Sequence, residues 1–175
     1  QQDMMDLILL NCQVPRERLA DFRAQIAANQ FGIQRFQALC NRYGMPLLSQ
    51  VFDALLDYAE RRMRAGIAAI PDGVYSFQDI FEGDEQPEPL IFKIKVEVTG
   101  EAIHLDFAGN PPQVQAGLNI VHTALLATVY YAVKTIADPD APPNAGLFRP
   151  ITVSAPEASI VNASAPAAVN GRTNT

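Results

Sequence analysis

The chain has 175 residues, of which 49% are hydrophobic, and its formal net charge is -6. A chain of this length and composition can bury a core and is too apolar to be disordered throughout. The acidic balance and the scattering of its 13 Lys and Arg residues argue against nucleic-acid binding, which needs a basic surface along the phosphates.

Membrane insertion and metal binding through cysteine are also disfavoured. The longest apolar runs, at 7–10 and 123–133, fall short of the ~20 residues that a spanning helix needs. The start of the sequence lacks the pattern of a secretory leader, and Cys12 and Cys40 lack the spacing of a zinc or redox motif. We therefore expect a cytoplasmic protein with two reduced thiols.

Two long helices are predicted in the first third of the chain. After residues 14–18, apolar residues recur at steps of three, four or seven, which predicts one apolar stripe on a helix that ends near Gly44. The stripe consists of Leu19, Phe22, Ile26, Ile33, Phe36, Cys40 and Tyr43. A second helix is predicted over 47–69, with ion pairs Asp57–Arg61 and Glu60–Arg64 on its wet face. Its expected buried residues are Leu48, Phe52, Leu55, Ala59, Met63 and Ile67.

Beyond the turn at 71–73 the apolar period changes to two, which is typical of strands. Strands are predicted over 74–81, 90–98 and 102–108, with an exposed acidic connection at 82–89. A third helix is predicted over 118–136, with an apolar stripe of Leu118, Val121, Leu125, Val129, Ala132 and Ile136.

Two further strands are predicted near 151–154 and 159–162. The fold class is therefore α+β, in which long N-terminal helices precede an antiparallel sheet with a further packed helix. We divide the chain into a helical segment, 1–70, and an α+β segment, 71–175.

Few residue patterns point to chemistry on their own. His104 and Asp106 share one face of a strand, which we interpret as a solvated face, and we interpret His122 as a core-edge residue satisfied by the backbone. The sequence has no G-x-S-x-G, phosphate-binding glycine loop or H-E-x-x-H motif. Its serines have no histidine close in sequence, which leaves spatial partners open.

Three polar segments are candidates for recognition. The loops at 109–119 and 142–150 combine proline, glycine and asparagine, which suits binding of a small amide or simply makes good turns. On the first long helix, Asp21, Gln25 and Asn29 form a polar line beside alanines. That line either contacts another surface or a ligand, or is an ordinary partly exposed face.

Five blocks of the sequence, in order, resemble those of the hydantoinase B/oxoprolinase family. The blocks are DFRAQIAANQFGIQRF (21–36), LLDYAERRMRAGIAAIPDGVYSF (55–77), VTGEAIHLDFAGNPPQVQAGLN (98–119), VYYAVKTIADPDAPPNAGLFRPITVSAPEASIVN (129–162) and PAAVNGRTN (166–174). PPNAGLFRPITV is the most specific of these stretches.

The resemblance implies a piece of the B subunit of an ATP-dependent hydrolase that opens cyclic amides such as 5-oxoproline or hydantoins. A hydantoinase A-type partner with ATP and Mg would phosphorylate the substrate carbonyl oxygen, and the B side would hydrolyse the intermediate with a metal-activated water. The expected partners are this A subunit and the rest of the B subunit, in a hetero-oligomer.

One family motif, resembling GGTHLPD, has no counterpart here, so the resemblance places the divalent metal in upstream B sequence and no metal ligand in this chain. The segment alone would then be inactive. The residues that the blocks carry over as lining or supporting the substrate cavity are Asp21, Arg23, Gln25, Asn29, Asn119, Asn144, Phe148, Arg149 and Asn170. None of them receives an individual catalytic role.

Two alternatives stay open. Relatives of the same family serve in acetone- or acetophenone-type carboxylases, for which the phosphorylated species would be an enol. The segment could also be a scaffolding module that forms an A–B or B–B interface and touches no substrate.

Overall fold

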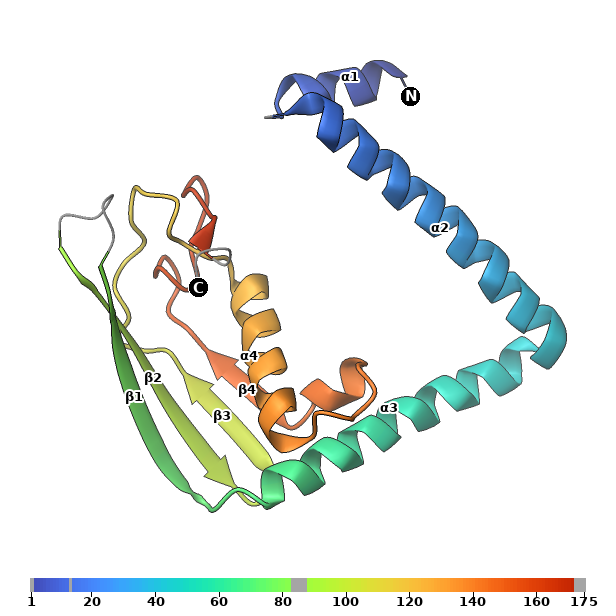
Figure 1. Cartoon of the computed structure of the whole chain (residues 1–175). Coiled ribbons are helices and arrows are strands. Elements are labelled where there is room, and N and C mark those ends of the chain that lie inside the picture. The colour runs from blue at the N-terminus through green and yellow to red at the C-terminus, as the bar shows by residue number, and fades with distance from the viewer. Residues whose placement is uncertain (1, 13, 83–87, 172–175) are drawn as a thin grey trace. The chain divides into compact units, whose positions relative to one another are not determined.

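The structure is a computed structural model that describes residues 2–12, 14–82 and 88–171 (Figure 1). It forms two compact units, Gln1–Phe52 and Asp53–Thr175, so the division falls within a helix. The division that the sequence suggested at residue 70 stays a prediction. The acidic connection predicted at 82–89 lies largely outside the described residues.

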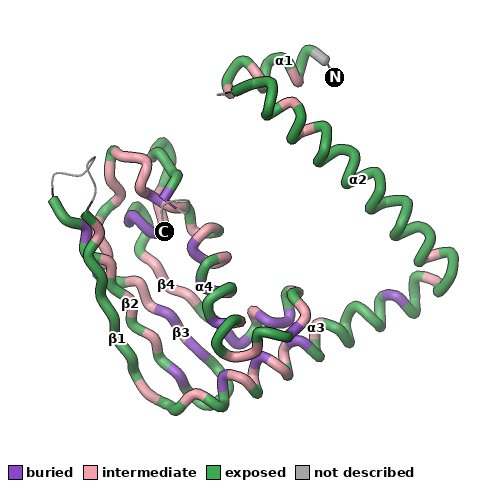
Figure 2. Tube along the Cα trace, in the orientation of Figure 1, coloured by how far each residue is buried: buried purple, intermediate pink, exposed green. Residues whose placement is uncertain are grey.

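The first unit is helical. It contains α1 (Gln2–Leu10), which the sequence analysis did not predict, α2 (Pro15–Tyr43) and the start of α3 (Met45–Ala68). Pro15 stands at the start of α2, where its missing N–H costs nothing, and Gly44 ends the helix with a φ of 78°. No residue of α2 is buried, and its tube shows only the exposed and intermediate colours (Figure 2).

In the second unit, α3 contributes Ala59, Met63 and Ile67 to the core, and all three are fully buried. The prediction that Phe52 and Leu55 are buried is wrong, because these side chains are 42% and 47% exposed. They lie on the turns of α3 that precede its core-forming part.

The sheet has the order β1-β2-β3-β4 (Figure 1). Its strands are β1 (Gly73–Phe81), β2 (Leu90–Thr99), β3 (Ala102–Asp106) and β4 (Ile151–Ser154). The first two pairings are antiparallel, as predicted, but β4 lies parallel to β3, so the sheet is mixed. The α+β class is confirmed.

The strand predicted at 159–162 is not formed. Ser159 and Asn162 make only an isolated bridge, and the N–H of Ile160 donates to the carbonyl of Pro111 in a loop. The segment therefore bonds to the loop at 111–120 and not to the sheet.

One face of the sheet is covered by α4 (His122–Ala137), which buries Leu125, Val129 and Val133 (Figure 1). The helix begins four residues later than predicted, because Leu118 and Asn119 bridge to Val169. The prediction that Ile136 belongs to the buried stripe is wrong, because Ile136 is 75% exposed. Val133 is buried at this end of the helix instead. Val121 and Ala132 are likewise exposed.

A 3-10 turn, η1 (Ala145–Phe148), leads into β4. The core between helices and sheet includes Val98, Ile103 and Leu105 from neighbouring strands. Because side chains alternate along a strand, the intervening residues of β2, β3 and β4 lie on the opposite, polar face.

Candidate functional site

The polar face of the sheet brings together residues that are about fifty positions apart in sequence. The parallel register sets His104 beside Thr152 and Asp106 beside Ser154. Ile103 and Leu105 are buried on the core face, which fixes the two polar pairs on the other face. We call His104, Asp106, Thr152 and Ser154 the strand-pair cluster.

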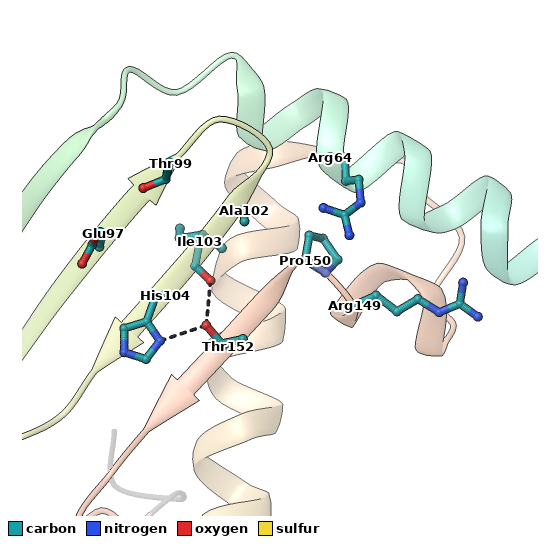
Figure 3. A pocket seen from close by; sticks show the side chains of 9 residues that line it. All are labelled: Arg64, Glu97, Thr99, Ala102, Ile103, His104, Arg149, Pro150 and Thr152. Atoms are coloured by element: carbon teal, nitrogen blue, oxygen red, sulfur yellow. Dashed lines mark hydrogen bonds between the residues drawn. The ribbon is translucent and has the colours of Figure 1, made fainter.

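Hydrogen bonds connect all four members of the cluster. The Oγ1 of Thr152 is 2.8 Å from Nδ1 of His104 (Figure 3), and the Oγ of Ser154 is 3.2 Å from Nε2. Ser154 also donates to Oδ1 of Asp106 at 2.8 Å. The imidazole is therefore held between two hydroxyl groups.

The Asp106 carboxylate is stabilised in its charged form. The backbone N–H of Ala108 donates to Oδ1 at 3.0 Å, and together with the Ser154 hydroxyl it lowers the pKa of Asp106 below its ordinary value. Burial opposes these two hydrogen bonds by raising the pKa, and the charges of His104 and Lys95 each lower the pKa by less than burial raises it. Asp106 is thus an anionic acceptor and not a proton donor near neutral pH.

The hydrogen-bond directions define the role of His104. Ser154 has one hydroxyl proton and gives it to Asp106, so Nε2 of His104 donates to Ser154. The hydroxyl of Thr152, which lies 2.8 Å from Nδ1, also donates to the carbonyl of Ile103 at 3.5 Å. A Ser-His-Asp triad needs the carboxylate on the histidine, whereas here it is bonded to the serine. The cluster suits binding of a polar group or proton exchange better than nucleophilic attack by Ser154.

A cavity of about 200 Å³ opens beside the cluster (Figure 3). His104 and Thr152 line one part of it, and Arg64 and Arg149 line another, with Glu97 on β2. A small polar molecule entering this cavity would meet the guanidinium of Arg64, whereas the guanidinium of Arg149 points away from His104 and Thr152 (Figure 3).

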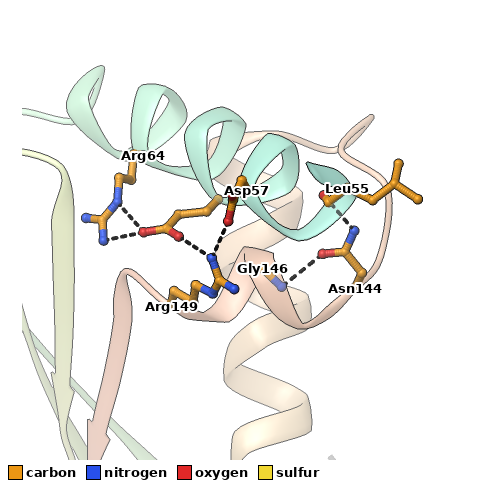
Figure 4. Close-up of polar contacts among 7 residues, drawn as sticks. Leu55, Asp57, Arg64, Asn144, Gly146 and Arg149 are labelled. Atoms are coloured by element: carbon orange, nitrogen blue, oxygen red, sulfur yellow. Dashed lines mark hydrogen bonds and ion pairs between the residues drawn. The ribbon is translucent and has the colours of Figure 1, made fainter. Parts of the chain in front are cut away.

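The two arginines of the cavity are held by acids on α3 (Figure 4). Arg149 donates to Asp57 and Glu60 at 2.8 Å each, and Arg64 pairs with Glu60 at 2.7 Å. Hydrogen bonds from Arg149 and Arg64 lower the pKa of Glu60. The predicted Glu60–Arg64 pair is present, whereas Asp57 bonds to Arg149 in place of the predicted Arg61.

The PPNAGLFRP stretch attaches the start of β4 to α3 (Figure 4). The Asn144 side chain accepts from the N–H of Gly146 at 2.9 Å, which caps η1, and donates to the carbonyl of Leu55 at 3.3 Å. Gly146 lies so close to α3 that a Cβ there would be 2.0 Å from the carbonyl oxygen of Leu56. Asn144 and Arg149 therefore position one wall of the cavity.

Asn119 is fully buried, and its side chain is bonded to backbone on both of its polar atoms. It accepts from the N–H of Val114 at 2.8 Å and donates to the carbonyls of Val114, Ala116 and Ala168. Its amide thus holds the loop at 109–119 to the segment near the end of the chain. Asn170 is exposed and borders, with Asn119, a small cavity of about 80 Å³.

The remaining candidates lie on α2 in the first unit. Asp21 pairs with Arg18 at 3.0 Å, and Arg23, Gln25 and Asn29 are exposed. The candidates thus fall into separate groups: those on α2, Asn144 with Phe148 and Arg149 at η1, and Asn119 with Asn170. Their role at a substrate cavity stays a prediction.

Thr152 and Ser154 were not predicted as site residues, although their alternation with Ile151 and Val153 places them on a polar strand face and spatial partners of the serines had been left open. The prediction that the backbone satisfies His122 is wrong, because Nδ1 of His122 is buried without a hydrogen-bond partner among the described residues.

Within 2–12, 14–82 and 88–171, no group of three or more His, Cys, Asp or Glu could hold a metal ion. No helix in the described part of the chain is long and apolar enough to cross a membrane.

The fold and the site define an α+β module that carries a polar cavity at the junction of a mixed sheet and a helix. The sequence model of the family described as hydantoinase B/oxoprolinase matches residues 1–175. The chain therefore belongs to the hydantoinase B/oxoprolinase family.

Among curated proteins, the chain is 32% identical over 97% of its length to an uncharacterized protein of Methanocaldococcus jannaschii, and 30% identical over 95% to the caprolactamase subunit beta of Pseudomonas jessenii. It spans only 30% and 29% of these two relatives.

Two solved structures are similar to the whole chain. The crystal structure of the ATP-dependent caprolactamase from Pseudomonas jessenii matches 98% of this chain and 30% of its own, with a TM-score of 0.84 and 30% identity. A nucleotide-free acetone carboxylase matches 99% of this chain and 25% of its own, with a TM-score of 0.82. At 12% identity, the second likeness shows the fold alone.

Proposed function

We propose that the chain is part of the B subunit of a cytoplasmic, ATP-dependent cyclic-amide hydrolase that opens 5-oxoproline, hydantoin or a related lactam. The observation that carries this proposal is the family match over residues 1–175. The 30% identity and 0.84 TM-score with an ATP-dependent caprolactamase support the lactam class of substrate.

The proposed reaction divides between two subunits. An A-type partner, with ATP and Mg, transfers the γ-phosphoryl group to the lactam oxygen, which leaves ADP and an O-phosphorylated imidate. On the B side, water adds to the imidate carbon and the ring C–N bond breaks, which gives an amine and an acyl phosphate. A second water releases phosphate and the carboxylic acid.

We propose that the cavity beside the strand-pair cluster borders the B-side substrate path. Arg64 offers guanidinium donors to a carboxylate or phosphate in this cavity, while both ring nitrogens of His104 are bonded to the hydroxyls of Thr152 and Ser154. Among the described residues no group of three or more His, Cys, Asp or Glu could hold a metal ion. The family resemblance assigns the divalent metal to the rest of the B subunit, and no step here passes through it.

ATP cleavage that depends on substrate tests this function. The assembled enzyme is incubated with ATP and, separately, 5-oxoproline, hydantoin, caprolactam and acetone. Cleavage with one or more cyclic amides and none with acetone is expected. Cleavage that only acetone elicits would favour the carboxylase alternative and overturn the first proposal.

The scaffolding alternative can be tested at Asn144 and Arg149, whose side chains bond to α3 within this chain. Alanine at each position in the complete enzyme separates the two functions, with Arg61→Ala on the exposed face of α3 as the control. A fall in kcat/KM in an enzyme that still assembles supports a role at the substrate path. Lost assembly with unchanged turnover per assembled complex supports a scaffold.

A further inference from the structure

A second cavity, of about 310 Å³, lies between the loop at 109–119 and the segment at 164–171 of the second unit. It shares no described lining residue with the cavity beside the strand-pair cluster. Its volume is within the range of small-molecule sites. We call it the loop cavity, and the described residues that line it, all uncharged, are Gln113, Val114, Gln115, Pro166, Ala167 and Ala168.

Hydrogen bonds hold the two walls of the loop cavity together. The buried Asn119 amide accepts from the N–H of Val114 and donates to the carbonyls of Val114 and Ala168, so one side chain joins both walls. Oε1 of Gln113 accepts from the N–H of Ser164 at 2.8 Å, which makes a second connection between them. The cavity is therefore formed before any ligand enters, which lowers the entropy lost on binding.

Two carboxamide side chains of the loop cavity keep unused hydrogen-bonding groups. Gln113 is bonded only through Oε1, which leaves its NH₂ group without a partner among the described residues. The Gln115 side chain is exposed and makes no hydrogen bond within the described part of the chain. The cavity thus offers neutral donors and a neutral acceptor, whereas a charged ligand group would find no opposite charge among these lining residues.

An amide that is part of a small ring matches this set of groups. The ring keeps the N–H and the carbonyl oxygen on the same edge of the amide. The carboxamide of Gln115 also presents an N–H and a carbonyl oxygen side by side, so the two edges can pair through a donor and an acceptor each. The ligand carbonyl has a second lone pair, which the NH₂ group of Gln113 can use.

We propose that the loop cavity binds a neutral cyclic amide, with Gln115 paired to the amide edge and Gln113 donating to the carbonyl oxygen. The choice of a cyclic amide as the ligand rests on the proposed function. An O-phosphorylated imidate has lost the N–H and carries a phosphoryl group on the oxygen, so it cannot make these bonds. The loop cavity therefore holds the substrate before its phosphorylation and does not hold the intermediate.

Photolabelling of the assembled enzyme without ATP tests the site. The probe is caprolactam that carries a diazirine on a ring carbon, and labelled peptides are identified by mass spectrometry. We expect label in peptides that contain 113–115 or 166–168, and excess caprolactam should suppress it. N-methylcaprolactam, which lacks the N–H, should compete at least about 10-fold more weakly than caprolactam.

Substitution of the pairing residue gives the second measurement. Gln115→Leu should raise the probe concentration for half-maximal labelling at least about 10-fold. Gln78→Leu is the matched control, because Gln78 is also exposed but lies on β1 and does not line this cavity, and it should leave labelling unchanged. Circular dichroism establishes that both variants keep their fold.

Labelling that occurs only elsewhere in the enzyme, or that is the same in Gln115→Leu as in the wild type, would overturn the inference. ATP cleavage measured on the same preparation separates this failure from failure of the proposed function. Cleavage with cyclic amides but no label at this cavity contradicts the inference alone. Label at this cavity that caprolactam suppresses, with no cleavage for any cyclic amide, supports the inference and contradicts the proposed function.

Discussion

Gly146 allows η1 to lie against α3, and replacing it by alanine should separate the two. The added Cβ would lie 2.0 Å from the carbonyl oxygen of Leu56 and 2.7 Å from its carbonyl carbon. Both atoms belong to helix backbone, which cannot rotate away as a side chain can. The 3-10 turn must therefore move by about 1 Å or more, since a carbon and an oxygen approach no closer than about 3.3 Å.

The expected loss of stability comes from two effects. Overpacking of this kind costs about 1–3 kcal/mol. The shift also weakens the 3.3 Å hydrogen bond from Asn144 to Leu55, which is worth about 1 kcal/mol. Together they predict that the free energy of unfolding falls by about 3 kcal/mol, or roughly 10 °C in Tm for a unit of this size.

Urea and thermal denaturation, followed by circular dichroism, measure this loss. Gly117→Ala is the matched control, because its Cβ would meet only Asn170 Cβ at an ordinary 3.7 Å. Its stability should change by less than about 0.5 kcal/mol. A Gly146→Ala variant as stable as the wild type would refute the close approach of η1 to α3.

Three further changes test the core, the loop and the sheet face. Met63→Ala removes a fully buried side chain and should cost about 2–5 kcal/mol in urea denaturation, whereas Met45→Ala, at a residue 50% exposed, should cost far less. Asn119→Ala leaves Val114 N–H and several carbonyls unbonded and should cost about 3 kcal/mol; unchanged urea stability would contradict its role. Asp106 has a lowered pKa in the folded state, so its stabilising effect is full above the unfolded pKa of about 3.9 and is lost as pH falls through the folded value. Asp106→Asn should therefore flatten the stability–pH curve below about pH 5, and an unchanged curve would contradict this.

The sequence predicted the elements whose signals are local. The boundary between α2 and α3 follows from Gly44 and Pro46, which act within one turn. The hairpin of β2 and β3 follows from alternation on both sides of the short turn at Gly100, whose φ of 57° suits glycine. The α+β class rests on these features.

The sequence does not show which strands and side chains far apart in the chain lie next to each other. The direction of β4 depends on a connection of more than forty residues, so Thr152 and Ser154 could not be placed beside His104 and Asp106. The same applies to Arg149, whose bonds to α3 replace the local pair predicted for Asp57. Periodicity locates a face of an element but does not say which distant side chains meet it.

The central claim is that the chain works in the ATP-dependent opening of a cyclic amide. The most direct measurement follows ADP and the ring-opened amino acid together in one reaction of the assembled enzyme with 5-oxoproline, hydantoin or caprolactam. The account predicts equal amounts of the two products with at least one of these substrates. ADP formed with acetone, and no ring-opened product from any of the cyclic amides, would contradict it.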